Sequence, residues 1–129
     1  MLKKFWRYTG YVLIGLGILH TVVFAIECSD ALKEILISGL FDSIGSDAAR
    51  GLAWYGGIWF GITMILFGCF AQSWIKTTKQ PLPRYIGWVL AALGLLGAVL
   101  QPVSGAILVL LLGLAVVFLR PAYVETSVK

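Results

Sequence analysis

The sequence predicts an all-α integral membrane protein: a four-helix transmembrane bundle with a short amphipathic helix in the outer loop between its first two spans. Hydrophobic residues make up 60% of the chain and charged residues only 12%, whereas soluble domains carry about 45 to 50% apolar and about 25% charged residues. Four apolar segments are long enough to cross a hydrocarbon core, which needs roughly 20 residues at a rise of about 1.5 Å each. The basic residues gather between alternate segments, a pattern that fixes the orientation of membrane proteins.

The predicted spans cover residues 8–27, 52–75, 84–101 and 103–119, and we expect them to form one domain over residues 1–129. The apolar stretch of the first span is too long for a signal peptide, and no small-residue cleavage site follows it. Pro81 and Pro83 interrupt the helix between the second and third spans, and Gln101-Pro102 leaves room only for a tight turn before the fourth. The last two spans should therefore form an antiparallel hairpin.

The placement of charge predicts that both termini are cytoplasmic. Eight of the ten basic residues fall on one side of the predicted spans, and two fall on the other side, in the loop of residues 28–50. Short loops rich in Lys and Arg stay on the cytoplasmic side of a membrane. We therefore expect the loop of residues 28–50 to lie outside.

This outer loop carries apolar or small residues at the i, i+3, i+4, i+7, i+8 spacing of one helical face: Leu32, Ile35, Leu36, Gly39 and Leu40. The spacing predicts a short amphipathic helix. Such a helix either lies on the outer membrane surface or folds over the mouth of the bundle as a lid. The sequence does not choose between these two positions.

Small residues recur at helix-packing spacings in the second and third spans, at Gly57, Gly61, Gly87, Ala91, Gly94 and Ala98. Close van der Waals approach drives helix association in lipid, so these residues indicate contact surfaces. The simpler interpretation is contact within one bundle. A seam that joins a second copy of the chain or another membrane protein is the alternative.

The one histidine of the chain, His20, lies inside the first span, seven residues or roughly 10 Å from the outer end of that span. Ionisable groups at such depth usually face the bundle interior or a wet cavity. We therefore predict an outward-facing ligand site formed by His20, Glu27, Tyr55, Trp59, Gln101 and Ser104. The alternative is a neutral imidazole that only makes a hydrogen bond between helices.

Several chemistries lack the residues that they require. One histidine and two distant cysteines cannot form a bis-histidine haem site or a closed zinc site. The glycines lie in helices rather than in a phosphate-binding loop, and the basic residues form no solvated patch for a nucleic acid. We therefore predict no metal, no cofactor, no catalytic residue and no nucleic-acid partner.

Three functions stay open on the sequence alone. The first is the binding or carriage of a lipid or another small lipophilic molecule in the cleft around His20, because a mostly apolar pocket with few polar groups suits such a ligand. The second is a structural or interaction subunit of a larger membrane complex. The third is a small membrane enzyme such as an isomerase, which is the least favoured because only one strong acid or base candidate is buried.

Five short motifs distributed along the chain resemble those of a known family: Gly17-Ile18-Leu19-His20, Gly39-Leu40-Phe41, Trp54 to Gly61, Pro81-Leu82-Pro83 with Gly87-Trp88, and Pro102-Val103-Ser104-Gly105. Together they resemble a family of small four-helix bacterial membrane proteins that is catalogued as a domain of unknown function. The resemblance implies a multi-pass protein of the bacterial inner membrane and directs attention to His20. It implies no activity, substrate or cofactor.

Overall fold

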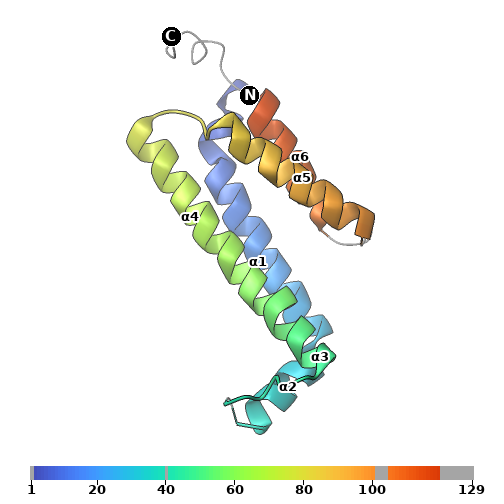
Figure 1. Cartoon of the computed structure of the whole chain (residues 1–129). Coiled ribbons are helices and arrows are strands. Elements are labelled where there is room, and N and C mark those ends of the chain that lie inside the picture. The colour runs from blue at the N-terminus through green and yellow to red at the C-terminus, as the bar shows by residue number, and fades with distance from the viewer. Residues whose placement is uncertain (1, 40, 101–104, 120–129) are drawn as a thin grey trace. The chain divides into compact units, whose positions relative to one another are not determined.

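A computed structural model describes residues 2–39, 41–100 and 105–119, and the regular elements in these ranges are all helical (Figure 1). The predicted all-α class is therefore confirmed. The described chain contains two compact units, one of Met1–Val12 with Gly68–Lys129 and one of Leu13–Phe67. The expectation of a single domain stays a prediction.

The first predicted span forms as α1, Thr9–Glu27, after a 3-10 helix η1, Leu2–Tyr8. The Thr9 hydroxyl donates a hydrogen bond to the Trp6 carbonyl at 3.1 Å where the two helices meet. No proline or polar run interrupts this stretch, so the backbone hydrogen bonds continue to the end of the apolar sequence.

The predicted helix of the outer loop forms as α2, Ser29–Ile37. It is shorter than the expected apolar stripe, because Gly39 lies beyond its end with a φ of +77°, a conformation that terminates helices. Ile35 is buried whereas Leu36 is exposed, so the stripe is only partly covered. Leu40, the last residue of the expected stripe, lies outside the described residues.

The second predicted span is a longer helical run, Ala48–Thr78, made of α3 (Ala48–Gly51), the π-helix η2 (Leu52–Trp59) and α4 (Phe60–Thr78). It begins four residues before the predicted start, because the Asp47 side chain accepts hydrogen bonds from the backbone N–H groups of Ala49 and Arg50 and caps α3. The π-helical turn was not predicted, since the apolar pattern of this stretch is that of an ordinary helix.

The third and fourth predicted spans form α5, Arg84–Leu100, and α6, Ala106–Phe118, which pack side by side as an antiparallel pair (Figure 1). A side chain at Gly94 would meet the Leu110 Cα at 2.6 Å, and one at Gly87 would meet the Val117 Cγ2 at 2.8 Å. The glycines thus let the two backbones approach. The predicted hairpin pairing is confirmed, and the predicted turn at Gln101-Pro102 lies outside the described residues.

Two of the helical runs, Lys4–Glu27 and Ala48–Thr78, are long and apolar enough to cross a membrane by length and composition, with 24 and 31 residues. Only 22% and 28% of their most apolar windows are buried within the chain, which is unlike the core helix of a soluble protein. The described parts of α5 and α6 are shorter, with 17 and 13 residues.

Candidate functional site

Within the unit of residues 13–67, glycines bring α1 into close contact with the start of α4. A side chain at Gly17 would lie 2.8 Å from the Ile65 Cγ1 and 2.9 Å from the Gly61 carbonyl oxygen. A side chain at Gly61 would in turn overlap the Thr21 hydroxyl, which donates to the Gly17 carbonyl at 2.9 Å. The contact is therefore backbone against backbone, and His20 lies one turn further along α1.

The imidazole of His20 bridges α1 to the π-helical turn. Its Nε2 lies 2.8 Å from the carbonyl oxygen of Gly56 in η2. The ring also packs against Phe24, with ring centroids 4.7 Å apart, and against Phe60 in an edge-to-face contact at 5.2 Å. His20 as a whole residue is half-buried.

The chemistry of this contact determines which ring nitrogen carries the hydrogen. A carbonyl oxygen only accepts hydrogen bonds, so the Nε2 of His20 must be the donor. In the neutral ring the other nitrogen, Nδ1, is then an acceptor. Nδ1 has no hydrogen-bond partner among the described residues, so the ring retains one unused acceptor.

The π-helical geometry of η2 makes the Gly56 carbonyl available to His20. In an α-helix the N–H of Phe60 would bond to the Gly56 oxygen four residues earlier. Here that N–H donates instead to the Tyr55 and Gly57 oxygens. Single π-helical turns occur frequently at functional sites, because they redirect backbone groups toward side chains and ligands.

The predicted partners of His20 are not among its described contacts. Tyr55 and Trp59 are 60% and 59% exposed, and Glu27 at the end of α1 is exposed as well. Gln101 and Ser104 lie outside the described residues. The site that the structure describes consists of His20, Phe24, Gly56 and Phe60.

The sequence analysis missed three of these residues, for different reasons. Phe24 lies four residues after His20 on the same helix, so helical spacing alone could have identified it. Phe60 directly follows Trp59, which is one of the predicted site residues, so the prediction was one residue away. No signal in the sequence identifies the Gly56 carbonyl, because its availability depends on the π-helical turn.

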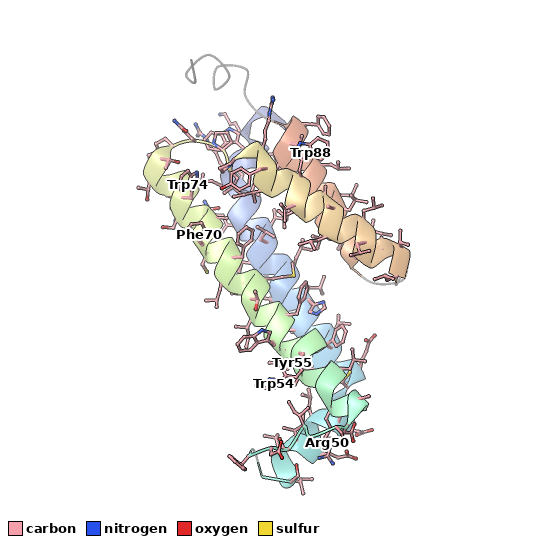
Figure 2. All side chains as sticks on the ribbon, in the orientation of Figure 1. Arg50, Trp54, Tyr55, Phe70, Trp74 and Trp88 are labelled. Atoms are coloured by element: carbon pink, nitrogen blue, oxygen red, sulfur yellow. The ribbon has the colours of Figure 1, made fainter. Side chains whose placement is uncertain are left out.

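A second polar cluster joins α2 to α3 through Arg50 (Figure 2). Its Nε lies 3.4 Å from Glu34 Oε2 and 3.6 Å from Asp47 Oδ2, and its Nη1 donates to the Ser43 carbonyl at 2.8 Å. The guanidinium thus holds the two helices and the intervening turn together. The sequence analysis had counted Arg50 only as a charge of the outer loop.

Gln72 of α4 forms a third polar feature, in the unit that contains the N-terminus. Its side chain is 7% exposed, and its Nε2 donates to the Arg7 carbonyl at 3.0 Å. Its Oε1 is buried without a partner among the described residues. Gly10 allows this approach, since a side chain there would lie 2.5 Å from the Gln72 Cβ. Gln72 therefore fixes the N-terminal end of α1 to α4.

The small residues that the sequence analysis considered for a partner have neighbours within the chain. Gly57 lies against Phe24, Gly61 against Thr21, Gly87 against Val117 and Gly94 against Leu110. Ala91 is buried where the Gly113 backbone approaches it, and Ala98 is half-buried. These contacts agree with packing inside one chain, and docking of a partner through the same residues stays a prediction.

The described residues contain no group of three His, Cys, Asp or Glu side chains that could hold a metal ion. In a comparison with known protein families, the model of the family described as "Family of unknown function (DUF6463)" matches residues 4–122. No curated protein and no solved structure matches the chain.

Proposed function

The chain belongs to this family of unknown function, and from that premise we propose that it is a multi-pass membrane protein that binds a small lipophilic molecule at His20. One observation carries the proposal: a half-buried histidine between two phenyl rings that keeps one ring nitrogen unpaired among the described residues. Binding sites for small molecules are typically apolar, with a small number of placed polar groups.

Embedding in a membrane is supported by the apolar surfaces that the helices leave uncovered. Large side chains are exposed along α1 and α4 at Ile18, Leu19, Val22, Ile26, Ile62, Leu66 and Phe70. Fully burying one such side chain contributes about 1.5 to 3 kcal/mol, and these side chains, which are 44% to 71% exposed, would each gain part of that amount in an apolar surrounding. A bilayer supplies that surrounding along the whole helix, and we infer that α5 and α6 complete a four-span bundle.

The orientation follows from charges and aromatic rings at one end of the helices. The Arg7 guanidinium lies 5.5 Å from the Trp6 ring, and the Lys76 ammonium lies 5.5 Å from the Tyr11 ring. Cations and amphipathic rings of this kind gather at membrane interfaces, and basic loops favour the cytoplasmic side. We assign this end to the cytoplasm of a bacterial cell and the α2–α3 loop to the outer side of the inner membrane.

This placement puts His20 within the outer half of the bilayer, roughly 10 Å below Glu27. Polar groups at that depth are expensive and mark functional sites unless their hydrogen bonds are satisfied. The Gly56 carbonyl satisfies Nε2 only. Nδ1 is left for a ligand that approaches from the lipid, and Phe60, whose ring contacts His20, is 48% exposed.

Native mass spectrometry of the protein in mild detergent tests the proposal. The wild type should carry a reproducible bound molecule that is absent from His20→Phe, a variant that retains an aromatic ring but lacks the nitrogens. Gly15→Ala is the matched control, since no atom lies within 4 Å of its added methyl group, and it should retain the ligand. If wild type and His20→Phe carry equal amounts of the bound molecule, His20 does not contribute to its binding.

The second candidate function is a structural subunit of a membrane complex, and the His20 to Gly56 hydrogen bond favours it. That bond by itself explains the half-buried imidazole as a packing contact between helices. This function predicts a protein partner that survives extraction in mild detergent and remains bound to His20→Phe. A bound lipophilic molecule with no protein partner would favour the first function instead.

A further inference from the structure

The hydrogen-bonding state of His20 restricts the chemistry of the proposed ligand. We infer that the ligand is a lipophilic alcohol or phenol whose hydroxyl donates a hydrogen bond to Nδ1 of His20. The inference rests on the proposed function, because it names the ligand class of the same site.

The hydrogen bond between Nε2 of His20 and the Gly56 carbonyl makes the other ring nitrogen, Nδ1, a hydrogen-bond acceptor. The Gly56 oxygen accepts a hydrogen bond at 2.8 Å, so the hydrogen of the neutral imidazole lies on Nε2. The π-helical turn reinforces this state, because the Phe60 N–H bonds to Tyr55 and Gly57 rather than to Gly56. Rotating the ring by about 180° would place the Cε1–H group, rather than a nitrogen, at the Gly56 oxygen and would break this hydrogen bond.

Nδ1 of His20 is a hydrogen-bond acceptor in an apolar surrounding, so it selects ligands that carry a hydrogen-bond donor. Ethers, esters and ketones offer only acceptors, so they would leave Nδ1 unpaired, which costs about 1 to 3 kcal/mol for a buried group. An ammonium donor would bring a charge into the bilayer, and no described carboxylate contacts the His20 ring to balance it. A hydroxyl supplies the donor and stays neutral.

The apolar neighbours of His20 restrict the rest of the ligand, apart from its hydroxyl group. The His20 ring is flanked by the phenyl rings of Phe24 and Phe60 at centroid distances of 4.7 and 5.2 Å. Aromatic and aliphatic groups pack well against such rings. The neighbouring surface of α1 exposes apolar side chains such as Leu19 and Val23, which suit an alkyl chain. The site therefore fits a hydroxyl head on an apolar body.

The test measures the ring nitrogen resonances of His20, the single histidine of the chain. The full protein is labelled with 15N-histidine, purified with a histidine-free tag, and placed in bilayers or micelles for nuclear magnetic resonance. The probes are 4-hexylphenol and its methyl ether, which have nearly the same shape and differ in the hydroxyl hydrogen. The apo spectrum should show the hydrogen on Nε2.

Addition of the phenol should shift the Nδ1 resonance, and the phenol should bind roughly threefold to tenfold more tightly than the ether, the range expected for one net hydrogen bond. His20→Phe should bind the two probes equally. A hydrogen found on Nδ1, or equal binding of the two probes by wild type, would overturn the inference while leaving a ligand site in place. If neither probe binds and no molecule co-purifies, the proposed function fails together with the inference.

Discussion

Because α1 and α4 are in close contact, substitutions of two glycines of α1, Gly15 and Gly17, should have different effects on stability. They lie two residues apart and therefore on different faces of α1. An added methyl group at Gly15 has no atom within 4 Å, whereas one at Gly17 would lie 2.8 Å from the Ile65 Cγ1 and 2.9 Å from the Gly61 oxygen. Gly17→Ala should therefore destabilise the protein relative to Gly15→Ala.

The comparison isolates the cost of packing from the helix preference of alanine. Alanine is favoured over glycine inside a helix by about 1 kcal/mol, and both variants gain this amount. The overlap at Gly17 involves the Gly61 carbonyl, which cannot rotate away, so the helices must separate. Overpacking of this kind costs about 1 to 3 kcal/mol, and the free energies of unfolding of the two variants should differ by that amount.

The assay is equilibrium unfolding of both variants with sodium dodecyl sulfate in mixed micelles, followed by circular dichroism. Separation of the helices should also lengthen the His20 to Gly56 hydrogen bond, so Gly17→Ala should change the histidine ring nitrogen resonances and Gly15→Ala should not. Equal stability and identical histidine resonances in the two variants would refute the close approach of α1 and α4 at Gly17.

Three further predictions follow from other parts of the molecule. Arg50→Ala should increase protease cleavage and amide exchange in the turn between α2 and α3, because it removes two ion pairs and a carbonyl contact, whereas Lys33→Ala, which removes only an exposed pair, should not. Leu66→Lys should reduce the carbonate-resistant membrane fraction, since a lysine near the middle of a span costs about 3 kcal/mol; a water-exposed site would show almost no effect. An impermeant thiol reagent added to intact cells should label Cys28 and spare Cys69, although both thiols are free and the Cys69 side chain is exposed; labelling of Cys69 alone contradicts the proposed orientation.

Most of the helices could be predicted from the sequence because their signals are local. Apolar runs and prolines specify α1, α5 and α6 to within a few residues. Helical spacing also predicts α2, but its end depends on the positive φ of Gly39, which a count of apolar positions does not consider. Local sequence rules thus predict that these helices form more accurately than they predict the residues at which the helices end.

The site could be predicted only in part, because it depends on the rotation of one helix against another. Counting residues from the membrane boundary gives the height of a side chain but not its direction, and each residue turns an α-helix by about 100°. Phe60 rather than Trp59 therefore contacts His20. The π-helical turn changes the rotation again, and the apolar pattern of residues 52–59 does not distinguish it from an ordinary helix.

The Arg50 cluster illustrates the same limit in the loop of residues 28–50. Glu34 and Arg50 are far apart in sequence, and their charges alone indicate only which side of the membrane the loop occupies. Their contact requires the sharp turn that follows α2, where Asp42 has a φ of 50°. The count of basic residues therefore predicts the orientation of the loop but not the ion pairs that organise it.

Photo-crosslinking with mapped adducts tests most directly whether a lipophilic molecule binds at His20. A lipophilic phenol that carries a diazirine is irradiated with the protein in membranes, and the modified peptides are identified by mass spectrometry. We predict adducts concentrated on the peptides that contain Phe24 and Phe60, which decrease with excess unlabelled phenol and in His20→Phe. Adducts distributed evenly over the exposed apolar residues of α5 and α6, without competition, would contradict a specific site at His20.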